Sequence, residues 1–438
     1  MAAPARRSNP LPEGTLEVGV GLLVAGATAY LFLVVAARAL GEVQYASLSV
    51  LWALVFLGGP GFFLPLEQEV SRALAARRAR HIGTGPVLRR ASLVGAVIAL
   101  TLVAVVFVAR EPLLDSLFDG EVLLLVGLMI ALVGYCIGHL ARGSLSGLGR
   151  FRAYSLYIGT EGVARFLGCL ALALFGVSTA GAYGLALGLA PLVAIAVALR
   201  GQRDLVSDGP NAPWSELSTA IGWLLLGSVL AQALVNVPVL AVRVLATAEE
   251  ATAAGRFQLG LVVARVPLFL FQAIQAALLP KLSALAGSGR IEEFRSGFRR
   301  LVVVVIALGT SATVAAFVIG PFAVRTLFGS EYTLDRRTLG LLAAASGAYM
   351  LAMAMAQAVI ALGGHTRMAL CWLASVIVFA GVTALGDDLF LRVEVGLLAG
   401  SLAAAVGMAV IVIGRIRACA AVDPDHLVEA IHDVALEP

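Results

Sequence analysis

Apolar stretches long enough to cross a membrane dominate this sequence of 438 residues, and its second half repeats motifs of the first half. Residues 59–68 read GPGFFLPLEQ and residues 266–275 read VPLFLFQAIQ, so a proline, aromatic residues and a glutamine recur in step. Upstream of these motifs, Arg38-Ala39-Leu40 returns as Arg243-Val244-Leu245. The copies are separated by nearly half of the chain. Such a repeat predicts two lobes of six helices each in parallel repeat.

The composition supports a membrane protein built from helices. A spanning helix needs about 20 apolar residues, because the hydrocarbon core is roughly 30 Å thick and a helix rises about 1.5 Å per residue. Here 60% of the residues are hydrophobic and 13% are charged, whereas charged residues make up about 25% of soluble domains. A transmembrane barrel would show short alternating segments instead.

The sequence therefore predicts an all-α integral membrane protein with about 12 transmembrane helices, arranged as two six-helix lobes around a central cavity. The expected spans are Leu16–Ala37, Ala46–Leu66, Ala91–Ala109, Val122–Leu140, Ala153–Phe175, Ala180–Leu199, Thr219–Leu240, Ala253–Leu279, Leu301–Ile319, Leu339–Leu362, Met368–Leu385 and Val395–Ile413.

Arginine-rich loops mark one side of the predicted protein. Residues 72–90, 142–152 and 281–300 hold most of the basic loop residues, whereas the opposite loops also carry acidic residues. The positive-inside rule predicts that the first set of loops and both termini lie on the cytoplasmic side of the membrane. We expect this membrane to be a bacterial inner membrane. The formal net charge of +4 then reflects this multi-pass topology and contact with acidic lipids, not nucleic acid.

A polar break separates the two lobes. Residues 208–213 read DGPNAP, and clustered Pro, Gly, Asn and Asp are typical of a linker. We therefore expect an N-terminal lobe at residues 1–200, a cytoplasmic linker at 201–217, a C-terminal lobe at 218–416 and a cytoplasmic tail at 417–438.

Motifs for catalysis and cofactor binding are absent from the sequence. It contains no Walker loop and no His-Glu zinc motif, and Cys136, Cys169, Cys371 and Cys419 do not have metal-ligand spacing. We expect neither an enzyme nor a bound metal or cofactor.

Two motifs resemble those of a known superfamily. Residues 38–45 read RALGEVQY, similar to the R-x-L-G-x-x-x-Y stretch that closes the first helix of polysaccharide-type flippases. Residues 142–151 read RGSLSGLGRF and resemble the G-x-x-x-G-x-G-R-F stretch that closes their fourth helix. These proteins belong to the multidrug/oligosaccharidyl-lipid/polysaccharide flippase superfamily, and the resemblance implies two six-helix lobes around a central cavity. The second lobe departs from the pattern, since His365-Thr366 stands where the first lobe has Arg150-Phe151.

Ionisable residues within the spans are the main candidates for a binding site, because a charge in hydrocarbon costs roughly 2.5–3.5 kcal/mol. Glu161 and Arg165 are one helical turn apart and can pair, and Arg265 precedes Pro267 by two residues. Inward-facing Arg165 and Arg265 would offer two planar guanidinium groups to one phosphate. The alternative is structural: Glu161 neutralises Arg165, and Arg265 bonds carbonyl groups of a neighbouring helix. A role of Glu161 in binding a coupling proton or sodium ion also stays open.

Amide side chains accompany these charges. Gln232 and Asn236 are one turn apart in the seventh span, and Gln272 and Gln275 follow the proline of the eighth. They are candidates for contacts with glycan hydroxyl groups, or else for hydrogen bonds between helices.

Two prolines occupy matching positions in the repeat. Pro60 and Pro267 each remove a backbone donor from a helix. We interpret them as hinges between states, with fixed bends as the alternative.

Together, these features predict a flippase that moves a polyprenyl-phosphate-linked glycan precursor from the inner to the outer leaflet for cell-envelope polysaccharide biosynthesis. Its expected partners are the lipid-linked glycan, membrane lipids, a coupling cation (Na⁺ or H⁺) and polysaccharide-assembly proteins. The first alternative is a cation-coupled multidrug antiporter of the same superfamily, which would need acidic and aromatic cavity walls. The second is a non-transporting membrane scaffold for envelope assembly.

Overall fold

The computed structural model describes residues 14–217, 221–268, 271 and 290–420, and this part of the chain is almost entirely helical. Its first half contains α1 (Thr15–Ala79), α2 (Gly85–Val108), α3 (Arg110–Pro112), η1 (Leu113–Leu117), α4 (Val122–Gly147), α5 (Phe151–Leu174), α6 (Ala180–Ala198) and η2 (Trp214–Glu216). Its second half contains α7 (Ile221–Leu245), η3 (Ala248–Glu250), α8 (Ala253–Ala264), α10 (Ile291–Phe328), α11 (Arg336–Ala361), α12 (His365–Ala384) and α13 (Leu389–Ala420).

The label α1 covers two membrane crossings. As one straight helix its 65 residues would extend about 98 Å, whereas the hydrocarbon core is roughly 30 Å thick. The backbone leaves helical geometry at Gly41 (φ 67°, ψ 176°), a conformation that glycine adopts readily because it lacks a Cβ atom. The sequence predicted a longer connection, between Ala37 and Ala46. Instead, a single glycine separates the two helical segments.

The described helices confirm the prediction of an all-helical, multi-pass membrane protein. With α1 counted once, ten of them are long and apolar enough to cross a membrane. Helix α8 is a shorter apolar helix of 12 residues.

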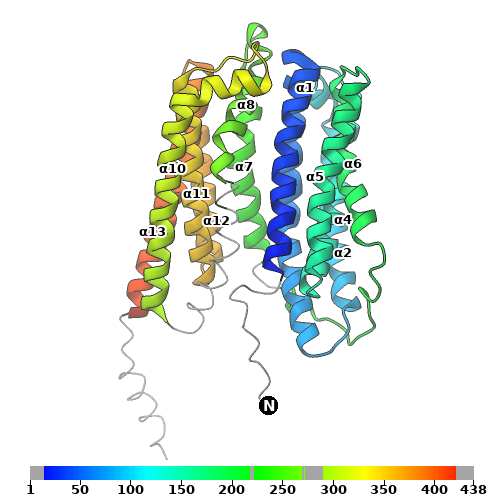
Figure 1. The fold of residues 1–438 in the computed structure, drawn as a ribbon. Coiled ribbons are helices and arrows are strands. Elements are labelled where there is room, and N and C mark those ends of the chain that lie inside the picture. Colours follow the sequence, from blue (N-terminus) through cyan, green and yellow to red (C-terminus); the bar gives the residue numbers. More distant parts are fainter. Residues whose placement is uncertain (1–13, 218–220, 269–270, 272–289, 421–438) are drawn as a thin grey trace, which may run out of the picture.

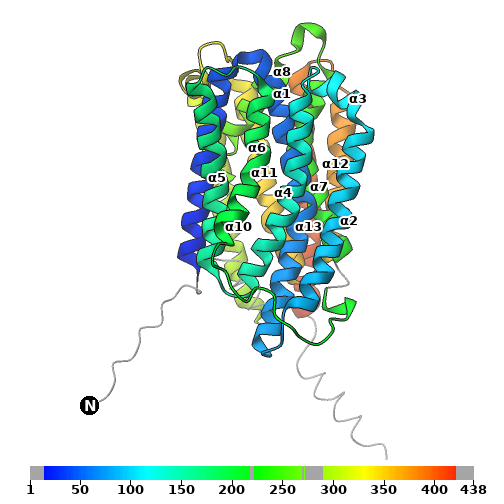
Figure 2. The ribbon, with the colours of Figure 1, turned by 90° about the vertical axis from the view of Figure 1, so that its right-hand side faces the viewer.

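The helices form two lobes. In the first, α4 and α5 pack against α1, α6 packs against both of them, and α2 packs against α4. In the second, α11 packs against α10 and α13, while α12 joins α13 to α7. The lobes meet where α1 contacts α7 and α8 (Figure 1). Figure 2, turned by 90°, shows the same helices running roughly parallel from one end of the molecule to the other.

Residues 201–217 are docked on the first lobe. The guanidinium of Arg77, whose side chain is 3% exposed, donates to both carboxylate oxygens of Glu216 at 2.8 and 3.0 Å. It also donates to the carbonyl oxygens of Gly83 at 2.6 Å and Pro210 at 3.2 Å. The hydrogen bonds from Arg77 hold the pKa of Glu216 below its ordinary value. These contacts tie the segment predicted as a linker to the end of α1.

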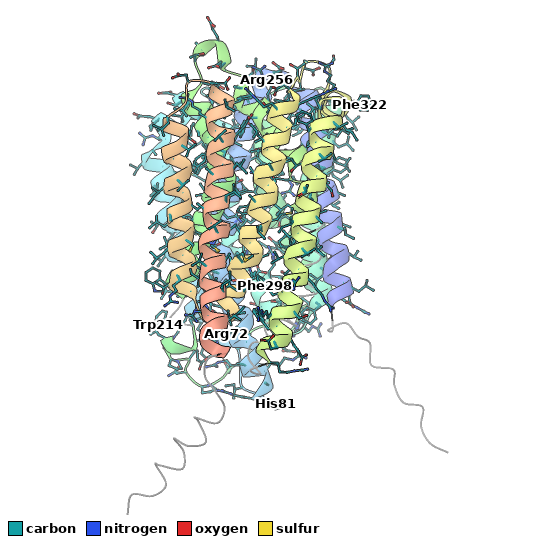
Figure 3. The ribbon with its side chains drawn as sticks, turned by 90° about the vertical axis from the view of Figure 1, so that its left-hand side faces the viewer. Arg72, His81, Trp214, Arg256, Phe298 and Phe322 are labelled. Carbon is teal, nitrogen blue, oxygen red and sulfur yellow. The ribbon has the colours of Figure 1, made fainter. Side chains whose placement is uncertain are left out.

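We call this end of the molecule the linker end. Figure 3 shows Arg72, His81 and Trp214 there, and Arg256 and Phe322 at the opposite end.

Candidate substrate site between the lobes

A cavity of about 150 Å³ lies where the two lobes meet. Helix α1 contributes apolar and aromatic walls from both of its segments, and α7 and α8 contribute amides and one arginine. The lining residues are Ala29, Tyr30, Leu33, Trp52, Phe56, Gln232, Val235, Asn236, Gln258, Val262, Arg265 and Leu268.

Arg265 supplies positive charge to this wall. It caps the C-terminal end of α8, where the negative end of the helix dipole favours a cation. Its guanidinium donates to the carbonyl oxygen of Val235 on α7. The phenol groups of Tyr30 and Tyr349 lie close enough to interact with its charge. Among the described residues, no carboxylate forms an ion pair with it. Arg265 is therefore a cation without an acidic partner in the described part of the cavity.

The amides of the cavity come from two helices of the second lobe. Asn236 Nδ2 donates to the backbone oxygen of Gln232 at 3.0 Å and to its side-chain oxygen at 3.2 Å, so the predicted pair shares a bond. Gln258, which the sequence analysis missed, also lines the cavity. It precedes Arg265 by seven residues, about two helical turns. This spacing could have predicted that Gln258 and Arg265 lie on the same side of the helix. Gln272 and Gln275 lie outside the described residues.

Arg165 lies inside the first lobe rather than in the described cavity wall. Its side chain is 5% exposed and its Nη1 lies 3.7 Å from Glu161 Oε1. The guanidinium covers the rings of Trp52 and Phe56, 5.2 and 5.8 Å from their centroids, and both rings line the cavity. Tyr135 donates to Glu161 at 2.8 Å. Arg165 thus supports the aromatic wall from behind, in the structural arrangement that the sequence left open.

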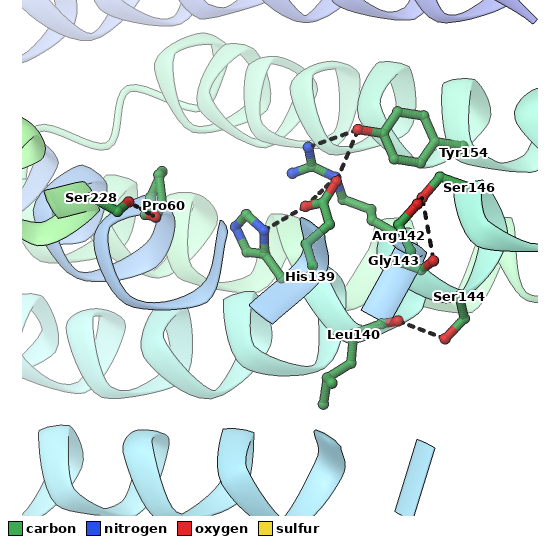
Figure 4. A network of polar contacts seen from close by, with 11 residues as sticks. Pro60, His139, Leu140, Arg142, Gly143, Ser144, Ser146, Tyr154 and Ser228 are labelled. Carbon is green, nitrogen blue, oxygen red and sulfur yellow. Dashed lines mark hydrogen bonds and ion pairs between the residues drawn. The ribbon is translucent and has the colours of Figure 1, made fainter. Parts of the chain in front are cut away.

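A second buried network lies nearer the linker end and joins α1, α4 and α5. Glu67 is 5% exposed. Its carboxylate bonds His139 Nδ1 at 2.6 Å, accepts from the Tyr154 hydroxyl at 2.9 Å and lies 3.3 Å from Arg142 Nε. Figure 4 shows the side chains of His139, Arg142 and Tyr154 converging on this point. Since both charges are paired, the network holds three helices of the first lobe together.

The two prolines differ in their surroundings. Pro60 lies within α1, and its carbonyl oxygen accepts a hydrogen bond from Ser228 of α7 at 3.3 Å. Pro267 follows Arg265, where α8 has ended, and residues 266–268 are helical. Pro60 therefore contacts the opposite lobe, whereas Pro267 follows a helix end.

Reciprocal polar contacts join the lobes at the end opposite the linker end. Arg38 of the first lobe donates to the carbonyl oxygens of Thr326 and Leu327 in α10, at 2.6 and 2.8 Å. Tyr332 of the second lobe donates to the carbonyl oxygen of Ala37 at 3.0 Å.

Arg243 makes the contact in the other direction. From the second lobe it pairs with Asp119 and donates to the carbonyl oxygen of Ser116 at 3.1 Å. Arg38 and Arg243 are the repeated arginines of the sequence, so each copy of this motif makes a contact with the opposite lobe. We call these two arginines and their partners the clamp, and this end of the molecule the clamp end.

Comparisons with known proteins agree with this architecture. No family model matches the chain. Two uncharacterized proteins of Mycobacterium tuberculosis, from the strains CDC 1551 / Oshkosh and ATCC 25618 / H37Rv, are each 26% identical over 417 residues, which cover 91% of this chain and 92% of theirs.

Solved structures that share this fold include transporters. An inward-facing multidrug resistance MATE family transporter of the MOP superfamily has a TM-score of 0.69 at 17% identity, covering 92% of this chain and 99% of that one. An outward-facing structure of such a transporter has a TM-score of 0.65 at 16% identity, covering 93% and 96%. A MATE structure in a bent conformation also scores 0.65. The chain therefore has the two-lobed helical fold of these proteins.

Proposed function

We propose that this protein is a membrane transporter that works by alternating access, and that its substrate carries a negative charge. The fold supports the first part, because solved structures that share it include inward-facing and outward-facing transporters. The lobes are in contact at the clamp end and have a cavity between them. This arrangement fits the transport state in which the cavity opens toward the linker end.

Arg265 is the observation that carries the choice of substrate. A guanidinium at the cavity wall with no described carboxylate beside it is suited to a phosphate, because its planar donors bind two oxygens and keep their charge. The amides of Gln232, Asn236 and Gln258 add donors and acceptors for sugar hydroxyl groups. A polyprenyl-phosphate-linked glycan has both groups, with a lipid tail that stays in the bilayer while its head crosses.

The test is headgroup accessibility of a polyprenyl-phosphate-linked oligosaccharide in proteoliposomes. Loss of the hydrogen bonds to phosphate in Arg265→Ala should cost about 1.5–3 kcal/mol, a roughly 10- to 150-fold fall in translocation. Arg265→Lys should retain part of the activity, because an ammonium keeps the charge but loses the planar fork. Arg295→Ala, which alters an exposed arginine (66%), is the control. Wild-type translocation that persists unchanged in Arg265→Ala would overturn the substrate assignment.

A multidrug antiporter is the second candidate function. The aromatic rings of Tyr30, Trp52 and Phe56 in the cavity wall and the multidrug resistance transporter with the same fold favour it. Cationic drugs would be stabilised by cavity carboxylates, and the described lining contains none. Export of a cationic dye by the same proteoliposomes, without movement of the lipid-linked substrate, would establish this alternative.

A further inference from the structure

A buried carboxylate of the second lobe takes no part in the proposed substrate site. Glu394 of α13 is 0% exposed. Within the described structure, neither of its oxygens has a partner in hydrogen-bond geometry. An isolated ionised carboxylate in such surroundings is strongly destabilised, so the group must be neutralised by a proton or a cation.

A surface pocket at the clamp end leads toward this carboxylate. The pocket has a volume of about 310 Å³, and Arg256, which Figure 3 shows at the clamp end, is part of its wall. Asp335, Arg337, Thr338 and Asp388 also line it. Thr338 is the polar neighbour of Glu394, and the charged groups that act on its carboxylate are Arg337, Asp335 and Asp388. The carboxylate therefore lies behind the wall of an open polar pocket.

The charges of the pocket come from several elements. Arg337 of α11 lies 3.9 Å from Asp335, which caps α11, and 3.9 Å from Asp388, which precedes α13. Glu250 of η3 and Arg256 of α8 complete the charged wall. Arg337 stands between the two aspartates, and Arg256 is not among the charged groups that act on Glu394, so neither arginine forms an ion pair with this carboxylate in the described structure.

The face of α13 that carries Glu394 also extends toward Arg265. Leu397 is three residues after Glu394, about one helical turn further along the same face. It lines a small cavity of about 10 Å³ together with Arg265, Ser346 and Tyr349. Glu394 thus lies between a pocket at the clamp end and the arginine of the substrate site.

Proton binding fits these surroundings better than sodium binding. A metal cation takes several oxygen ligands at once, and the described residues contain no group of three or more Asp, Glu, His or Cys side chains that could hold one. One buried carboxylate next to one hydroxyl is enough for a proton. We propose that Glu394 is a proton-binding site of the second lobe, loaded through the pocket at the clamp end.

Carbodiimide labelling tests this proposal without any transport substrate. Dicyclohexylcarbodiimide reacts with protonated carboxyl groups in apolar surroundings, and mass spectrometry identifies the modified residue. We expect Glu394 to be labelled in the full-length protein at low pH, with labelling that falls as the pH rises. Glu67 is the internal comparison: it is also buried, at 5% exposed, but it is paired with Arg142 and His139, so it should stay unlabelled at neutral pH.

Infrared spectroscopy provides the second measurement. The band of a protonated carboxylic acid should be present in the wild-type protein and reduced in Glu394→Gln, a variant that keeps the size of the side chain. Absence of both the labelling and this difference band would overturn the proposal. Labelling that sodium chloride suppresses at constant pH, but choline chloride does not, would assign the site to sodium instead. Neither result depends on whether the chain moves a lipid-linked glycan.

Discussion

Breaking the clamp should shift the protein toward a state open at the clamp end. Arg243→Gln removes the ion pair with Asp119 and the hydrogen bond to Ser116, and Arg38→Gln removes two hydrogen bonds to α10. Hydrogen bonds to charged groups contribute about 1.5–3 kcal/mol each. Asp119 is 48% exposed and Arg38 is exposed, so water replaces much of what is lost.

We therefore assign about 1.5 kcal/mol to each substitution, near the lower limit of that range. This corresponds to a roughly tenfold change in the equilibrium between the two states for each single variant. The two arginines share no partner, so the effects should add to roughly a hundredfold in the double variant.

Electron paramagnetic resonance distances measure this shift. Spin labels would replace Val43 in the first lobe and Phe322 in the second, whose side chains are 66% and 70% exposed. In a background without other cysteines, they would measure the distance between the lobes. We expect a longer distance to gain population in each single variant and to dominate in the double variant. Arg110→Gln is the matched control, because Arg110 pairs with its neighbour Glu111 within the first lobe. An unchanged distance distribution in the double variant would refute the idea that the clamp holds the lobes together.

Four further predictions concern the first lobe. Glu216→Ala removes the carboxylate that accepts hydrogen bonds from the buried Arg77 guanidinium. It should weaken the docking of residues 201–217 on the first lobe by about 2 kcal/mol. Hydrogen exchange would show this as a roughly 30-fold faster amide exchange of residues 205–217. Because the pKa of Glu216 is lowered by its bonds to Arg77, docking should be complete above the ordinary carboxyl pKa and be lost as the pH falls through the lowered value, which limited proteolysis would detect. Gly83→Ala would place a methyl carbon 1.9 Å from a carbonyl oxygen of the linker, so it should also speed this exchange. Glu67→Gln leaves Arg142, whose side chain is 17% exposed, without its acidic partner. It should cost about 3 kcal/mol, the lower end of the range for a buried pair, measured as a lower melting temperature in detergent.

Exposed pairs supply the controls for these variants. Glu293→Ala breaks a pair whose side chains are 59% and 55% exposed, and Glu111→Gln alters a side chain that is 78% exposed. Each should change stability by less than about 1 kcal/mol. Equal effects of buried and exposed substitutions would contradict the assigned roles of Arg77 and Glu67.

Local sequence patterns predicted the helices, and the duplication predicted two lobes. These features depend on hydrophobic length and on internal similarity, both of which can be read along the chain. The spacing of Glu161 and Arg165 also indicated that the two face the same side of one helix. By contrast, no sequence pattern could decide whether Arg165 or Arg265 reaches the cavity, because the rotation of each helix is set by its neighbours.

Contacts between distant helices account for the rest. Glu67 forms hydrogen bonds with residues of α4 and α5 that lie more than 70 residues further along the chain. A local sequence pattern therefore does not predict this network. The same holds for Arg77 and Glu216, which are 139 residues apart. Glu394 directly precedes the predicted span Val395–Ile413, where a carboxylate usually meets water. It is buried because α13 packs against α11.

The unequal charges of the two lobes determine where a membrane voltage acts. A charge that crosses the whole potential changes in free energy by about 2.3 kcal/mol per 100 mV. In the first lobe Arg165 moves together with Glu161, and the pair carries no net charge. In the proposed transport cycle Arg265, which has no acidic partner in the described part of the cavity, would move as a net charge. A transition that carried it through a third of the field would shift the equilibrium by about 0.8 kcal/mol per 100 mV, roughly fourfold. Energised and de-energised membranes would thus hold different populations of the two states, and the second lobe would be the part that responds.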